Sequence, residues 1–241
     1  MKGVILAGGK GTRLRPVTEI INKHLLPVGN YPMIYWSINK LKGAGVKDVM
    51  IVTNQEDISD FFQLLGNGEK FGINICYEIQ NRADGIADAL SYAEAFVEDK
   101  FIVLLGDNIF EDSLLPFIES FKKQAEGAKI LLKEVEDPER FGVAVLNQEK
   151  NLVSSIIEKP RTWISPYCVT GIYMYDRAVF DMIKNIKPSH RGELEITDVN
   201  NSYIHRSQMN FNLLNGWWID AGTFDSLQMA SRLVQKEFEV E

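Results

Sequence analysis

Strand-like and helix-like segments alternate through the first half of the chain, and this alternation restricts the fold more than any other feature. Apolar runs such as "GVILA" (3–7) and "FIVLLGDN" (101–108) are typical of buried strands, and each precedes a segment with helical spacing of apolar residues. Such alternation favours βαβ units around a parallel sheet. The predicted strands are 3–7, 49–54, 73–80 and 101–108, and the predicted helices are 32–44, 57–68, 85–96 and 112–124. We therefore predict an α/β fold with a Rossmann-like, mostly parallel central sheet and flanking helices.

The second half of the chain has a different pattern. Strand-like segments follow one another with short turns, at 128–135, 141–147, 152–159 and 167–176. Helices are predicted near 177–185 and 195–206, and a last helix follows Thr223 as its cap. Because no linker, repeat or low-complexity stretch separates the halves, we predict a single domain, 1–241, whose second lobe is rich in β-strands.

An open parallel sheet binds ligands beyond the carboxyl ends of its strands. This rule applies to the turn after Ala7, to the segment after Gln80 and to the "GDN" that follows Leu105. Three separate stretches are therefore expected to line one crevice.

The turn "LAGGKGTRLRP" (6–16) combines glycines with cations, as an anion-binding loop does. Neither common phosphate motif fits it. A dinucleotide motif counted from Gly9 has Leu14 in place of its third glycine, and a P-loop would place lysine after the second glycine, whereas Lys10 precedes Gly11. A glycine-rich turn alone is also compatible with an ordinary strand-to-helix connection.

The charge balance points to a small anionic ligand. The net charge of −7 argues against nucleic acid or an anionic membrane as the main partner. The first 24 residues nevertheless carry Lys2, Lys10, Arg13, Arg15 and Lys23 against a single acid, Glu19. With two strand-borne cysteines, no signal peptide and no run of membrane-spanning length, the sequence favours a cytoplasmic protein.

The turn and the "KHLLPV" (23–28) that follows it resemble the signature of the sugar nucleotidyltransferase family, G-G-x-G-T-R-L-x-P with a downstream K-x-x-L-P. Further segments resemble its glucose-1-phosphate thymidylyltransferase branch, in the order "MIYW", "LLGDNIF", "DPERFGV", "IEKP", "VTGIYMYD", "RGELEITD" and "WIDAGT". The resemblance covers nearly the whole chain. It implies the nucleotide-diphospho-sugar transferase fold, with a nucleotide-binding part of about 1–112 and a sugar-binding part of about 113–241.

The reaction implied by this resemblance joins glucose 1-phosphate to the α-phosphate of dTTP, giving dTDP-glucose and pyrophosphate, a first step toward dTDP-rhamnose or other deoxysugars. Two alternatives stay open: the same chemistry with UTP, CTP or another hexose 1-phosphate, and a non-catalytic nucleotide-sugar-binding subunit. Longer relatives carry a further helical C-terminal segment, so a short form with weak feedback regulation is expected. The sequence leaves open whether the chain forms a homo-oligomer.

The resemblance also assigns the catalytic groups. Arg13 would grip the β- and γ-phosphates, and Lys23 would reach the α-phosphate. Asp107 and Asp220 would hold Mg²⁺, which proteins bind through one or two carboxylates together with substrate phosphates. Either aspartate alone is equally typical of a turn.

The resemblance implies a nucleotide site formed by Leu6, Ala7, Gly8, Gly9, Gly11, Thr12, Gln80, Asp84 and Gly85. Gln80 would hydrogen-bond the pyrimidine edge, and Gly85 would let the ring lie against backbone. The stretch between them, Asn81 to Ala83, differs from the proline-rich loop of many thymidylyltransferases. This difference bears on the nucleotide preference.

The implied sugar-phosphate site consists of Gly142, Glu158, Lys159, Val169, Thr170, Gly171, Glu193 and Trp218. Glu158 would accept hydrogen bonds from sugar hydroxyls, and Lys159 would hold the phosphate as a point charge. Glu193, like Glu195, is equally typical of the acidic first turn of a helix. The three histidines, of which His24 adjoins Lys23, are too scattered to suggest a triad or a zinc site.

Overall fold

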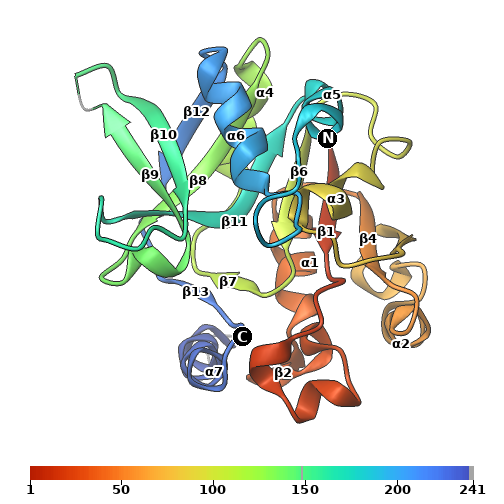
Figure 1. The fold of residues 1–241 in the computed structure, drawn as a ribbon. Coiled ribbons are helices and arrows are strands. Elements are labelled where there is room, and N and C mark those ends of the chain that lie inside the picture. Colours follow the sequence, from red (N-terminus) through yellow and green to blue (C-terminus); the bar gives the residue numbers. More distant parts are fainter. Residues whose placement is uncertain (148, 239–241) are drawn as a thin grey trace.

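The protein, described by a computed structural model over residues 1–147 and 149–238, is built around one nine-stranded mixed sheet (Figure 1). The strands run in the order β10-β9-β11-β6-β1-β4-β5, with β8 paired to β11 and β12 paired to β8. Their bounds are β1 (Lys2–Leu6), β4 (Asp48–Asn54), β5 (Asn74–Gln80), β6 (Phe101–Leu105), β8 (Ala128–Glu134), β9 (Gly142–Asn147), β10 (Leu152–Glu158), β11 (Tyr167–Tyr175) and β12 (Met209–Leu213). Two further ladders pair β2 (Pro27–Val28) with β3 (Tyr31–Pro32) and β7 (Asn108–Phe110) with β13 (Trp218–Asp220).

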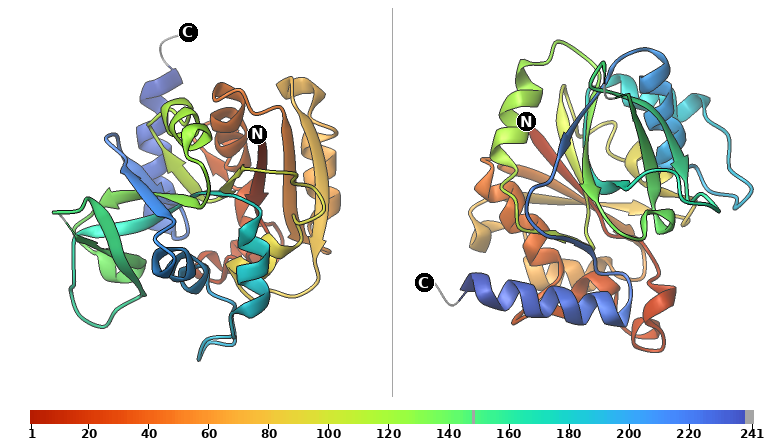
Figure 2. Two further views of the ribbon diagram at one scale, coloured as in Figure 1. Left: turned by 90° about the horizontal axis from the view of Figure 1, so that it is seen from above. Right: turned by 90° about the vertical axis from the view of Figure 1, so that its left-hand side faces the viewer.

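Helices cover both faces of the parallel half of this sheet (Figure 2, left). The helices of the described residues are α1 (Ile34–Gly43), α2 (Ile58–Leu65), α3 (Ile86–Ser91), α4 (Leu115–Lys123), α5 (Ala178–Asn185), α6 (Ile196–His205) and α7 (Phe224–Phe238), of which α7 packs away from this sheet. On β1, Val4 and Leu6 belong to the apolar cluster that includes residues of α3, α5 and α6, whereas Ile5 belongs to the cluster with α1, α2 and α4. Successive residues of a strand face opposite sides, so a sheet covered on both faces needs the continuous apolar run seen in the sequence. Strands β6, β1, β4 and β5 are all parallel, which confirms the predicted Rossmann-like fold class.

The second lobe extends the sheet with antiparallel strands. β11 pairs antiparallel with β6 and β8, and β9 pairs antiparallel with β10. Antiparallel strands need only short connections, as the β-rich second half of the sequence indicated. β12, which runs parallel to β8, was not predicted, because its "MNFNL" sequence carries two asparagines, a residue depleted in strands.

Several predicted elements are shorter than expected, and one of them, the strand that precedes Gly106, ends at the prospective site. The helix predicted at 85–96 ends as α3 at Ser91, and the strand predicted at 101–108 ends as β6 at Leu105. At Gly106 the chain leaves the sheet so close to His24 that a Cβ there would lie 2.7 Å from the ring Cδ2. The following residues form β7, which pairs with β13 and brings Asn108 opposite Asp220.

The last helix packs beside β2 and closes the lower end of the molecule as drawn (Figures 1 and 2). Its Ala230 and Val234 share an apolar cluster with Val28 and Trp36. Thr223 caps the helix as predicted, since its Oγ1 accepts the Ser226 N–H at 3.2 Å. No helix within the described ranges is long and apolar enough to cross a membrane.

Leu14, between the two arginines of the opening turn, is fully buried. We expect Leu14→Ala to lower the free energy of unfolding by about 2–5 kcal/mol, because truncation removes buried apolar surface and leaves a cavity. Ile20→Ala, at a side chain 89% exposed in the same loop, is the matched control and should change it by less than about 0.5 kcal/mol. Urea unfolding of both variants measures the difference, and equal effects would contradict the role of Leu14 as the anchor of the turn.

Candidate active site

A cavity of about 820 Å³ opens beyond the carboxyl ends of β1, β5 and β6 and continues along β9, β10, β11 and the start of α6. It brings together most of the side chains and glycines that the sequence singled out. Those that line it are Leu6, Gly8, Gly9, Thr12, Arg13, Lys23, Gln80, Gly85, Asp107, Gly142, Glu158, Lys159, Val169, Gly171, Glu193, Trp218 and Asp220. The expected crevice between three distant stretches of chain therefore exists.

Four of the selected residues do not line this cavity. Thr170 is fully buried and its hydroxyl donates to the Leu131 carbonyl at 2.8 Å. Ala7 is also fully buried, and its carbonyl accepts the Asn22 amide. The Asp84 carbonyl accepts the Leu194 N–H at 2.7 Å, while Gly11 adopts a φ of 57° in the turn. These four residues therefore contribute to the structure around the cavity and not to its lining.

Sequence reasoning missed several residues that line the cavity, namely Ile86, Ala89, Leu105, Arg140, Tyr173, Arg191, Ile196 and Thr197, and it placed Asn108 at the crevice only as part of "GDN". Arg140 and Arg191 lie in "DPERFGV" and "RGELEITD", two segments already noted for their resemblance. Their positive charge next to acidic residues was a usable signal. Asn108 and Thr197 act through contacts that only the folded chain creates.

Lys23 and Arg13 each face one of the two aspartates. Lys23 Nζ forms an ion pair with Asp107 Oδ2, and both side chains are largely buried. Arg13 Nη2 lies 3.6 Å from Asp220 Oδ2, and about half of the arginine side chain is exposed. A Cβ on Gly222 would lie 2.4 Å from that same Nη2 and 2.8 Å from Asp220 Oδ1, so glycine lets the backbone approach this ion pair closely.

The two aspartates have opposite protonation preferences. Burial, and then the neighbouring charge of Asp107, raises the pKa of Asp220 to about 6. Burial also acts to raise the pKa of Asp107, but the attraction of Lys23 together with the hydrogen bonds from Lys23 and Asn108 outweighs it and holds that pKa below its ordinary range. Two carboxylates that influence each other in this way lie close together.

His24 is a buried packing residue beside this pair. Burial, followed by the charge of Lys23, lowers its pKa to about 3, so the ring is neutral at physiological pH. Its Nδ1 lies 2.7 Å from Asn22 Oδ1, which also accepts the His24 backbone N–H. Because the amide oxygen can only accept, Nδ1 carries the ring proton.

Asp107 and Asp220 are the two carboxylates of the cavity that could hold a Mg²⁺ ion. Asp220 Oδ1 is buried and has no hydrogen-bond partner within residues 1–147 and 149–238. A buried carboxylate oxygen without a donor is costly and free to ligate a cation. The same part of the chain holds no group of three or more His, Cys, Asp or Glu side chains that could hold a metal, which argues against a closed zinc site. The two oxygen donors fit Mg²⁺, which takes further ligands from phosphates and water.

An asparagine links this pair to the aromatic wall of the cavity. Asn108 Nδ2 donates to Asp107 Oδ1 at 3.1 Å, while its Oδ1 accepts the Trp218 indole N–H at 2.7 Å and the Gly171 N–H at 2.8 Å. A Cβ on Gly171 would lie 2.6 Å from Asn108 Nδ2. Phe141 meets the Trp218 ring edge to face, with centroids 5.2 Å apart.

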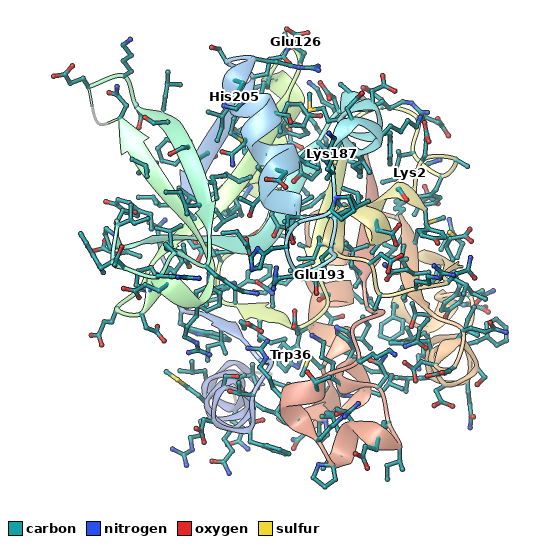
Figure 3. All side chains as sticks on the ribbon, in the orientation of Figure 1. Lys2, Trp36, Glu126, Lys187, Glu193 and His205 are labelled. Atoms are coloured by element: carbon teal, nitrogen blue, oxygen red, sulfur yellow. The ribbon has the colours of Figure 1, made fainter. Side chains whose placement is uncertain are left out.

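The far end of the cavity is acidic, and one arginine contacts three of its carboxylates. Arg191 Nη2 lies 2.8 Å from Glu195, 3.3 Å from Glu193 and 3.4 Å from Glu158. Glu158 Oε2 also accepts the Thr197 hydroxyl at 2.6 Å, which fixes that carboxylate. Figure 3 shows Glu193 on the loop before α6, near the middle of the molecule, whereas His205 lies at the opposite end of that helix.

Lys159 adopts a backbone φ of 41°, which is uncommon for a residue other than glycine. Its N–H bonds to the Phe141 carbonyl at 3.0 Å, and its Nζ lies 3.6 Å from Glu158 Oε1. Such backbone strain persists only where surrounding structure imposes it, and it gathers at functional sites.

Comparison with known proteins agrees with this arrangement. The sequence model of the family described as "Nucleotidyl transferase" matches residues 2–237. A glucose-1-phosphate thymidylyltransferase of Neisseria meningitidis serogroup A is 43% identical over 239 residues, which are 98% of this chain and 83% of that protein. The resemblance noted in the sequence is confirmed.

Solved structures agree as well. A Bacillus anthracis protein described as a candidate glucose-1-phosphate thymidylyltransferase, crystallised with sucrose, has 52% identity and a TM-score of 0.93, over 98% of this chain and 95% of its own. A UDP-glucose pyrophosphorylase complexed with UDP-glucose has 24% identity and a TM-score of 0.86, over 98% of both chains, and shares the fold.

The two aspartates should respond in opposite ways to loss of charge. Asp107→Asn leaves the Lys23 ammonium buried without its partner and should lower the free energy of unfolding by about 3–5 kcal/mol. Asp220→Asn removes a buried carboxylate charge beside Asp107, of which one oxygen has no hydrogen-bond partner in the described residues, and should raise it by about 1–2 kcal/mol. Denaturant unfolding at pH 7 without divalent metal measures both, and a destabilised Asp220→Asn variant would contradict the electrostatics described above.

Proposed function

Because the chain belongs to the nucleotidyl transferase family, we propose that it transfers a thymidylyl group from dTTP to glucose 1-phosphate, giving dTDP-glucose and pyrophosphate. The observation that carries this proposal is the pairing of Lys23 with Asp107 and of Arg13 with Asp220 on one wall of a single cavity. Phosphoryl chemistry of this kind needs positioned cations and carboxylates rather than a protein nucleophile. Residues 1–112 would supply most of the nucleotide site and 113–241 most of the sugar site.

The triphosphate would lie along the opening turn. The backbone of Gly8 and Gly9 lets phosphates approach closely, Arg13 faces the β- and γ-phosphates, and Lys23 faces the α-phosphate. The lysine lies beside Gly9, where a Cβ would come within 3.6 Å of its Nζ, so the cation and the backbone donors address the same anion. Mg²⁺ held by Asp107 and Asp220 would neutralise charge on the reacting phosphates.

The sugar phosphate would enter from the acidic end. Glu158, whose Oε2 is fixed by Thr197, would accept hydrogen bonds from sugar hydroxyls, and Lys159 would hold the phosphate. Arg191 and Lys159 offset part of the negative charge of the carboxylates at this end, which weakens their repulsion of an incoming anion. Trp218, fixed by Asn108, would form a flat apolar wall for the hexose ring.

The chemical step is an in-line displacement at the α-phosphorus. An oxygen of the sugar phosphate forms a new bond to the α-phosphorus while the bond from that atom to the bridging β-oxygen breaks, and pyrophosphate leaves with the electron pair. Lys23 and Arg13 stabilise the charge that builds up on the α-phosphate and on the leaving group. The product, dTDP-glucose, would supply deoxysugar synthesis.

The nucleotide preference is open to a direct test. With Mg²⁺ and glucose 1-phosphate, we expect pyrophosphate release to be fastest with dTTP among dTTP, UTP, CTP, GTP and ATP. A clear preference for UTP or CTP would leave the chemistry intact and reassign the base, which is the second candidate because residues 81–83 differ from the common thymidylyltransferase loop. Silence with every triphosphate and several hexose 1-phosphates would favour a binding subunit.

A comparison of Arg13 with its neighbour Arg15 distinguishes a catalytic cation from a surface cation. Arg13→Ala should lower kcat by about 10²–10³, because a charge aimed at the transition state is lost. Arg15→Ala is the matched control, since Arg15 is exposed and does not line the cavity, and its kcat should stay within about twofold of the wild type. Equal losses in the two variants would show that Arg13 contributes only general positive charge.

A further inference from the structure

The side-chain amide of Gln80 has a partner that no sequence pattern pointed to. Gln80 ends β5 and is nearly buried, with 6% of its surface exposed. Its Nε2 donates to Asp88 Oδ2, on the first turn of α3, at 2.8 Å, and more weakly to the Gly85 carbonyl at 3.4 Å. Both hydrogen bonds donated by Nε2 are therefore accepted by oxygen atoms.

The chemistry of Asp88 determines which way the amide lies. A carboxylate accepts hydrogen bonds and donates none, whereas an amide has one donor end and one acceptor end. Only the NH₂ end of Gln80 can therefore face Asp88 favourably, because the reverse orientation places two oxygens against each other. The assignment of the amide rests on this partner and not on the shape of the side chain, which is nearly the same in both orientations.

The oxygen of the amide consequently faces the nucleotide end of the cavity. Gln80 and Gly8 both line that cavity, and a Cβ on Gly8 would lie only 3.0 Å from Gln80 Oε1. Within the described ranges, no donor of the protein bonds to Oε1. Glycine at position 8 thus leaves an acceptor uncovered at the place where the opening turn approaches β5.

We propose that Asp88 is a positioning residue that holds the Gln80 amide with its oxygen toward the base, and that it thereby selects pyrimidines that donate a hydrogen at N3 over cytosine. This inference rests on the proposed function, whose nucleotide it specifies. Thymine and uracil carry N3–H, which an amide oxygen accepts, whereas N3 of cytosine is itself an acceptor and would face Oε1 with like partial charge. Nearly buried groups left unpaired in this way reject the wrong ligand strongly.

The test compares two nucleotides that share one sugar, dTTP and dCTP, with Mg²⁺ and glucose 1-phosphate. In Asp88→Asn and Asp88→Ser the new side chain can donate as well as accept, so the Gln80 amide is free to turn over. The ratio of kcat/KM for dTTP to that for dCTP should fall by about ten- to a hundredfold in both variants. Asp88→Glu, which still only accepts, should keep the wild-type ratio if its longer carboxylate reaches Nε2.

Glu94→Gln is the matched control for loss of one negative charge. Glu94 follows α3, pairs with Lys184 and does not line the cavity, so this variant should keep the wild-type ratio. Calorimetric titration of each variant with dTTP and with dCTP in the presence of Mg²⁺, without sugar phosphate, gives the same ratio from dissociation constants. If Asp88 merely held α3 in place, the variants would lose kcat/KM and affinity equally for dTTP and dCTP. The ratio of kcat/KM values and the ratio of dissociation constants would then both stay unchanged.

Each outcome bears on one of the two proposals. A lowered ratio in both Asp88→Asn and Asp88→Ser supports the positioning role, and an unchanged ratio overturns it. Wild-type turnover with no preference for dTTP over dCTP also overturns it, while the transferase reaction stands. If the wild type releases no pyrophosphate from dTTP, the proposed function fails, and the ratio of the dissociation constants still decides whether Asp88 selects the base.

Discussion

The ion pair between Lys23 and Asp107 joins the loops that follow β1 and β6, and the rest of the cavity is arranged around it. The lysine comes from the loop after β1 and the aspartate from the turn after β6, two adjacent parallel strands. Buried charges are tolerated only when paired, so each residue holds the other in place. Asn108 then carries this order to Trp218 and Gly171, and His24 packs against the same turn.

The charges of this site would also find new partners when substrate binds. Without phosphates, Lys23 compensates Asp107, whereas Asp220 keeps an oxygen without a donor in the part of the chain described. A buried oxygen without a donor lowers the stability of the folded protein, as is common at ligand-binding sites. A triphosphate with its cation would satisfy both: the lysine would gain a phosphate, and the two carboxylates would gain a metal.

Much of the fold could be predicted, and the misses have physical causes. Long apolar runs such as that of β6 are typical of strands buried on both faces. The four parallel strands β6, β1, β4 and β5 could therefore be predicted. β12 was missed because its pairing with β8, and not its own composition, makes it a strand. The predicted strand 101–108 was too long because the chain leaves the sheet after Leu105 and Asn108–Phe110 pairs instead with β13, a partner from a distant part of the chain.

By itself, the sequence determined the α/β class, the glycine-rich turn with its cations and the membership of a family, because these depend on local spacing and on motifs read along the chain. Only the tertiary structure decided which charges face each other. Asp107 and Asp220 come together because β7 pairs with β13. Arg191, on the loop before α6, contacts Glu158 at the end of β10. Likewise, the amide of Gln80 acquires its direction only when α3 brings Asp88 against it. Such pairings join residues far apart or on different elements, so no local pattern encodes them, and they are fixed by packing.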